Sequence, residues 1–244
     1  MLPLAPISIL PVLRELSPDS LGERFRPTAW KKHSLPYVDE LTERFSRNEF
    51  TRADVKQAFR EDVRKGVVFS LVWGFPNGFI NPKRPADLRN AWPHIDKLVD
   101  KVRSLQGRPG DCTPTEIIKA LNTPISGIAT SSTSKIAYFA GIQATSGRCL
   151  IYDSQVIKAI VSETFAELYS LRIQLVRQRD ETLPFGKKVQ SVNQVTTYLD
   201  YISGINSLCR KLERRFEPDQ VEEVLFAAGR AIKIPEIDGD GEEV

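Results

Sequence analysis

The stretch from Thr113 to Ile160 constrains the fold more than any other part of this 244-residue sequence. Its first four residues, Thr113-Pro-Thr-Glu116, form a capping box with proline at the first helical position. They predict a short helix that ends near Asn122. Glycine and a run of hydroxyl residues follow between Ser126 and Ser134, and this composition predicts a hairpin before a second helix.

The helix after the hairpin is predicted over about 133–140, with Lys135 in its first turn. The apolar run Leu150-Ile-Tyr152 then leads to Asp153, a residue type favoured at a helix N-cap. The sequence therefore predicts an amine and a carboxylate at neighbouring helix starts. Beside a hairpin that binds phosphate, this pair suits covalent attack on a sugar carbon in DNA.

Helical signals also dominate the rest of the chain, so the predicted fold class is all-α. Thr51 and Asp54 form a second N-terminal capping motif. The further elements expected are a short helix near 16–25, helices over 51–72, 85–105 and from Asp153 or Ser154 to about 169, a strand or extended loop over 171–176, a long helix over 189–216, and a last helix from Pro218 to about 232. Three regions are predicted: an irregular arm over 1–38, a domain over 39–234 and a disordered acidic tail over 235–244.

Composition excludes several classes of protein. Apolar residues make up 41% and charged residues 27% of the chain, which is typical of a soluble globular protein. No apolar run approaches the roughly 20 residues that span a bilayer, and the start of the chain reads as a mature terminus without a signal peptide. The three cysteines form no Cys-x-x-Cys motif and the two histidines lie far apart, so neither a metal nor a cofactor is predicted.

Net charge indicates a polyanionic partner. The chain carries +3, but five acidic residues lie in the tail, and the remainder carries +8. Such a balance favours nucleic acid, although a solvated basic surface is the competing interpretation.

The segment from Gly127 to Ile160 resembles the helix-hairpin-helix DNA glycosylases, specifically the branch built like 8-oxoguanine DNA glycosylase. The hairpin Gly127-Ile-Ala129, Lys135 and Asp153 carry the resemblance. The stretch Glu217 to Arg230 is also similar to the closing helix of bacterial proteins with that fold. Two positions depart from the family pattern: Ala129 stands where glycine is usual, and Gln155 stands where many relatives have histidine.

This resemblance implies two helical lobes with a cleft between them and a helix-hairpin-helix motif. It implies that Lys135 attacks C1′ of a flipped nucleotide and that Asp153 assists, with DNA lyase activity to follow. The implied partner is double-stranded DNA with a modified base, bound by a monomer in the cytoplasm at the nucleoid. The implied substrate is 8-oxoguanine by family default, and the alternative is a hypermodified base such as glucosylated hydroxymethylcytosine in phage DNA.

Two further groups of residues are candidates for DNA contact. The candidates for the DNA backbone are Gly127, Ile128, Ala129, Thr130, Ser131, Ser132 and Thr133. The candidates for a base pocket or wedge are Trp73, Phe75, Asn77, Phe79 and Gln155. Several of the candidate site residues have a plain structural alternative. Trp73 and Phe79 can be core rings, Asp153 can be a simple N-cap and Lys135 can be a solvated lysine. A non-catalytic DNA-binding module and a helical scaffold are the competing functions.

Overall fold

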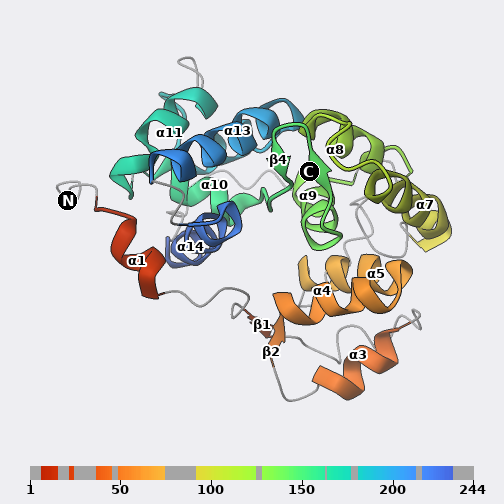
Figure 1. The fold of residues 1–244 in the computed structure, drawn as a ribbon. Helices are drawn as coiled ribbons and strands as arrows, with labels where there is room; N and C mark the ends of the chain where they lie inside the picture. Colours follow the sequence, from red (N-terminus) through yellow and green to blue (C-terminus); the bar gives the residue numbers. More distant parts are fainter. Residues whose placement is uncertain are drawn as a thin grey trace, which may run out of the picture.

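The computed structural model describes residues 7–15, 22–24, 37–45, 49–74, 92–124, 128–162, 164–176, 181–212 and 216–232. These residues form an all-α protein, as predicted (Figure 1). The helices are α1 (Leu10–Glu15), α3 (Val38–Phe45), α4 (Arg52–Glu61), α5 (Val63–Gly74), η1 (Trp92–His94), α7 (Ile95–Gln106), α8 (Pro114–Asn122), α9 (Thr130–Phe139), α10 (Ser154–Val161), η2 (Ala166–Leu168), α11 (Tyr169–Leu175), α12 (Phe185–Val192), α13 (Val195–Lys211) and α14 (Pro218–Ala231).

Two short antiparallel pairs are the strands seen in the described part of the chain. β1 (Gly22–Arg24) pairs with β2 (Glu49–Thr51), and β3 (Gln143–Ala144) pairs with β4 (Gly147–Arg148). No helix among the described residues is both long enough and apolar enough to cross a membrane.

Both predicted capping boxes form. Thr51 accepts from the Asp54 amide while the Asp54 carboxylate accepts from the Thr51 amide, and Thr113 and Glu116 make the same reciprocal pair. Each box satisfies amide groups that have no partner inside the helix. The start of the last helix at Pro218 is also confirmed.

Two helices, α4 and α5, occupy the region predicted as one helix over 51–72, so that prediction is wrong at Asp62. Asp62 has extended backbone angles, φ −158° and ψ 129°, and its amide donates to the Ala58 carbonyl. Its carboxylate accepts from the Lys65 amide at 3.0 Å. A short acidic side chain that binds nearby backbone competes with helix continuation, so Asp62 ends α4 and caps α5.

The helix predicted from Asp153 or Ser154 is α10, which begins at Ser154 and is shorter than predicted because it ends at Val161. The Ser162 hydroxyl donates to the Ala159 carbonyl and bonds the Thr164 hydroxyl at 2.6 Å. Hydroxyl groups that bind local backbone favour a helix end over a helix interior.

Residues 171–176 were predicted as extended, and this prediction is wrong because most of them lie in α11. The buried residues Leu171, Arg172 and Leu175 recur at helical spacing. Packing against α13 therefore outweighs the weak strand preference of this short apolar segment.

The single long helix predicted over 189–216 is interrupted, because α12 ends at Val192 and α13 begins three residues later, at Val195. The Val192 carbonyl accepts hydrogen bonds from the Tyr152 and Thr197 hydroxyls. Asn193 follows with ψ 67°, away from helical geometry. These two hydroxyls and the Gln194 amide, which donates to the Val192 carbonyl at 2.8 Å, thus replace the amide that would have continued the helix.

Two predictions near the N-terminal half are only partly testable. The helix predicted near 16–25 is wrong for residues 22–24, which form β1 because they pair with β2. Within the region predicted over 85–105, η1 and α7 account for the residues from Trp92 onward. Residues 85–91 and the acidic tail lie outside the described residues.

Helix α9 occupies a central position in the fold (Figure 1). It packs on α4, α5 and α8, whereas α10 packs on α14. Nearly every side chain of α9 is buried, including Ile136, Ala137, Tyr138 and Phe139. This burial fixes α9 in the core and thereby fixes the direction in which Lys135 points.

Candidate active site

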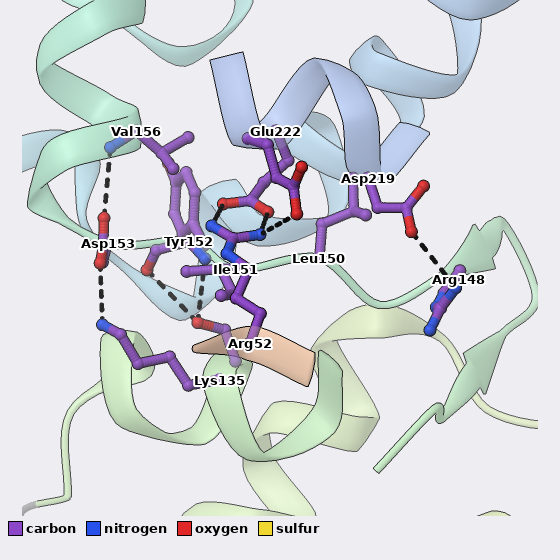
Figure 2. Close-up of polar contacts among 12 residues, drawn as sticks. Arg52, Lys135, Arg148, Leu150, Ile151, Tyr152, Asp153, Val156, Asp219 and Glu222 are labelled. Atoms are coloured by element: carbon purple, nitrogen blue, oxygen red, sulfur yellow. Dashed lines mark hydrogen bonds and ion pairs between the residues drawn. The ribbon is translucent and has the colours of Figure 1, made fainter. Parts of the chain in front are cut away.

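Lys135 and Asp153 meet in the folded protein. Lys135 Nζ lies 2.8 Å from Asp153 Oδ2, and the two residues are only 6% and 5% exposed. Figure 2 shows the amine of α9 directed at the carboxylate at the head of α10. Two charged groups removed from water in this way require each other, because an unpaired buried charge is costly.

Asp153 is the N-cap of α10 as well as the partner of Lys135. Its Oδ1 accepts from the Gln155 amide at 2.9 Å and from the Val156 amide at 3.2 Å. Burial would raise the pKa of Asp153, but the Lys135 charge and these hydrogen bonds outweigh burial and hold that pKa below its ordinary value. The carboxylate is therefore ionised at neutral pH.

Lys135 lies in the second turn of its helix, and the prediction of a first-turn lysine is wrong. α9 begins at Thr130, three residues earlier than expected, because the hydroxyl residues join the helix. Lys135 Nζ also donates to Ser131 Oγ at 3.1 Å, one helical turn back. A side chain on Gly74, at the end of α5, would come within 3.2 Å of Lys135 Cδ. The aliphatic part of Lys135 therefore packs against the end of α5, while its amine makes polar contacts with Ser131 and Asp153.

Side chains, not a sheet, hold the segment that delivers Asp153. The Tyr152 amide donates to Ser134 Oγ at 3.0 Å. The Tyr198 hydroxyl bonds both the amide and the carbonyl of Leu150, and the Tyr201 hydroxyl donates to the Ile151 carbonyl. Buried backbone polar groups need partners, and here α9 and α13 supply them.

A close backbone approach fixes the head of α10 from the other side. A Cβ on Gly229 of α14 would lie 1.7 Å from the Gln155 carbonyl oxygen. Only glycine permits this contact, so α14 rests directly on the first turn of α10. The position of Asp153 therefore depends on α14 as well as on α13.

A second buried ion pair lies close to the first, and the sequence analysis did not identify it. Arg52 is fully buried and bonds Glu222 through both terminal nitrogens, with Nη2 to Oε1 at 3.0 Å (Figure 2). Its guanidinium lies 5.2–5.5 Å from the ring centroids of Trp73, Tyr138 and Phe226. Arg52 follows the N-cap Thr51 at the start of α4, and nothing in this capping sequence indicates that the Arg52 side chain is buried.

The electrostatics of this second pair differ from those of the first. Burial raises the pKa of Glu222 to about 7, although Arg52 acts to lower it. Asp153 contributes to the increase, so the two carboxylates lie within electrostatic range of each other.

The hydroxyl residues proposed to contact the DNA backbone are mostly enclosed. Thr130, Ser132 and Thr133 are buried in α9, and the Thr133 hydroxyl bonds helix carbonyls. These hydroxyls are therefore not presented to a phosphate. Among the remaining candidates, Ile128 is buried, Ala129 is exposed, Ser131 is half-buried and Gly127 lies outside the described residues.

The candidates for a base pocket or wedge separate in a similar way. Trp73 is 1% exposed and packs on Phe139 and Phe226, so it is a core ring and not a wedge. Phe75, Asn77 and Phe79 lie outside the described residues. Gln155 is half-buried on the first turn of α10, and its amide oxygen has no partner in the described part of the protein.

No three His, Cys, Asp or Glu side chains of the described residues converge as a metal site. α8 and α9 are joined by residues 123–129, of which 125–127 lie outside the description. The hairpin itself thus remains a prediction.

The fold and the site define an all-α protein with a buried amine–carboxylate pair at the head of a helix. The chain belongs to the family described as "Putative 8-oxoguanine DNA glycosylase OGG-like protein", whose model matches residues 17–226. Neither the curated proteins nor the solved structures include a match to the chain.

Proposed function

We propose that this protein is a DNA N-glycosylase that excises a modified base from double-stranded DNA. The observation that carries the proposal is the buried contact of 2.8 Å between Lys135 and Asp153. Membership of the 8-oxoguanine DNA glycosylase-like family supports it. The target nucleotide has to leave the base stack to reach a buried amine.

In the proposed reaction, the Lys135 ammonium of the ion pair first gives up one proton to solvent, and the neutral amine then forms a bond to C1′ as the bond from C1′ to the base breaks. The base leaves with the bonding electrons and takes up the proton that the nitrogen loses once it is bonded to C1′. Opening of the sugar then gives a Schiff base, from which β-elimination breaks the strand on the 3′ side. Asp153 is ionised, and its negative charge stabilises the positive charge that develops on the sugar.

Phosphate contact is assigned to the start of α9 and to the hairpin before it. Amide groups at a helix N-terminus bind phosphate without reading sequence. The two helical lobes and the cleft between them belong to this proposal, as do a monomeric protein and a location at the nucleoid.

The first substrate to test is 8-oxoguanine, because the family description names it. The panel of duplexes also contains glucosylated hydroxymethylcytosine, the alternative substrate. Excision of one base and not the other identifies the substrate.

Borohydride trapping tests the role of Lys135. Reduction of the Schiff base should leave a covalent protein–DNA complex, and Lys135→Gln should abolish that complex while DNA binding survives. Lys158→Gln is the matched control, since Lys158 is also a buried lysine near Asp153 but its Nζ donates to the Ile232 carbonyl at 3.3 Å. Normal trapping by Lys135→Gln would show that Lys135 is structural, and the function would then have to rest on another amine.

A further inference from the structure

The amine of Lys135 contacts two oxygen acceptors that come from different elements. Asp153 Oδ2 lies 2.8 Å away at the head of α10, and Ser131 Oγ lies 3.1 Å away on α9 itself. Residues four apart on a helix share a face, so Ser131 reaches the amine without distortion of α9.

The two acceptors are themselves held in place. Asp153 Oδ1 is engaged by the amides of Gln155 and Val156, which leaves Oδ2 directed at the lysine. The Ser131 carbonyl accepts a hydrogen bond from the Ser134 hydroxyl at 3.1 Å, and that hydroxyl also accepts one from the Tyr152 amide. Ser134 thus links the turn of α9 that carries Ser131 to the segment that carries Asp153.

The carbon chain of the lysine is restrained as well. Gly74 approaches Cδ and Cε closely enough that an added Cβ would lie 3.2 Å and 3.7 Å from them. A neutral amine has two hydrogens and one lone pair arranged tetrahedrally around nitrogen with Cε. With the chain restrained and each hydrogen given to one acceptor, a single direction remains for the lone pair.

We propose that Ser131 is a positioning residue that, together with Asp153, binds both hydrogens of the neutral Lys135 amine and so aims its lone pair at C1′ of the flipped nucleotide. This inference rests on the proposed glycosylase function. It gives Ser131 a role distinct from the phosphate contact expected from sequence.

Loss of the Ser131 hydroxyl frees one hydrogen of the amine and lets the nitrogen rotate about the bond to Cε. Orientation of a nucleophile acts on the rate of the chemical step and not on the affinity for DNA. A hydrogen bond of this kind corresponds to about tenfold in rate. Ser131→Ala should therefore slow excision and trapping about tenfold at unchanged DNA affinity.

The experiment measures single-turnover excision, the rate of borohydride trapping, DNA affinity and thermal melting for the full chain. The variants are Ser131→Ala and Ser131→Thr, of which the second keeps a hydroxyl. Ser162→Ala is the control, because it removes a hydroxyl that bonds a helix carbonyl at the opposite end of α10. The expected result is a slow Ser131→Ala, a Ser131→Thr near the wild-type rate and an unchanged control.

Each other outcome overturns the inference. A wild-type rate in Ser131→Ala shows that Asp153 alone suffices, and a loss of DNA affinity in Ser131→Ala that Ser131→Thr restores shows that the hydroxyl contacts DNA instead. If the wild-type protein excises the base but no covalent complex can be trapped, then no amine attacks C1′. The inference then fails while the proposed glycosylase function stands. A wild-type protein that neither excises nor traps on any duplex overturns the proposed function and this inference together.

Discussion

Two buried ion pairs lie close together in this protein and differ in how completely their cations are enclosed. Arg52 gives two nitrogens to Glu222 and is surrounded by three aromatic rings. The Lys135 nitrogen contacts one carboxylate oxygen and one hydroxyl. The first arrangement suits a group that joins helices, and the second suits a group that reacts.

The carboxylates of the two pairs differ as well. Asp153 caps a helix, and backbone amides help to keep its pKa low. Glu222 lies within α14 beside Glu223, and burial raises its pKa to about 7. The comparison teaches that a buried carboxylate stays ionised where backbone N–H groups add to the effect of its cation.

The largest expected effect is on the enclosed pair. Arg52→Met should lower the free energy of unfolding by about 3–5 kcal/mol, because it leaves the buried Glu222 without its cation. Urea denaturation provides the measurement. The double variant Arg52→Met/Glu222→Met should recover part of the loss, since apolar residues of similar volume often replace a buried ion pair, while the buried Glu223 still loses its ion pair with Arg52 at 3.5 Å. A single variant as stable as the wild type would contradict the structural role of this pair.

Next in size is the effect on the reactive pair. Asp153→Asn should slow single-turnover excision on the order of 10²–10³, because the carboxylate acts on charge that develops in the transition state. The amide keeps an oxygen that can cap α10, so folding and DNA binding should survive. A binding titration and a thermal melt accompany the rate measurement. A variant that melts early yet excises normally once folded would reduce Asp153 to a helix cap.

The two carboxylates should also give opposite pH dependences. The pKa of Glu222 lies above that of an unfolded glutamate, so its stabilisation is complete below about pH 4.5 and is lost as the pH rises towards 7. This loss amounts to about 3 kcal/mol. The pKa of Asp153 is lowered, so its contribution is present at neutral pH and is lost at acid pH.

Urea denaturation at a series of pH values from 4.5 to 8 separates these contributions. Glu222→Gln should flatten the fall in stability that the wild type shows across this range. Parallel curves for the two proteins would mean that Glu222 does not titrate there.

The smallest effect should come from the hydroxyls that support the reactive pair. Tyr201→Phe leaves the buried Ile151 carbonyl without its donor and should cost about 1–2 kcal/mol. The excision rate should fall less than in Asp153→Asn. Thermal melting and single-turnover excision measure the two quantities, and a rate loss as large as that of Asp153→Asn would give Tyr201 a direct catalytic role.

Local signals in the sequence predicted the helical class, both capping boxes and the starts of α8, α10 and α14. They also selected Lys135 and Asp153, because each stands in a recognisable context: a hydroxyl-rich helix start and an apolar run ending in an N-cap. The interruptions at Asp62 and Asn193 escaped prediction, since each depends on side-chain bonds to backbone that compete with an otherwise helical pattern.

Tertiary contacts account for the parts of the site that sequence did not predict. Arg52 and Glu222 are 170 positions apart, and nothing near either residue indicates burial. Trp73 was a candidate for DNA contact because aromatic residues suit that role, yet the core of α5, α9 and α14 encloses it. The Lys135–Ser131 contact was within reach of sequence reasoning, because the spacing of four residues is visible once α9 is extended to Thr130.

The tyrosine support of residues 150–152 has a genetic consequence. The conformation of residues 150–152, just before Asp153, is held by hydroxyls from α13, some 50 residues later in the sequence. Alleles that damage the active site should therefore map to two separate stretches of the gene, one around Lys135 and Asp153 and another around Tyr198 and Tyr201. Substitutions in the second stretch should yield temperature-sensitive proteins, because they weaken the support of the reactive carboxylate without removing it.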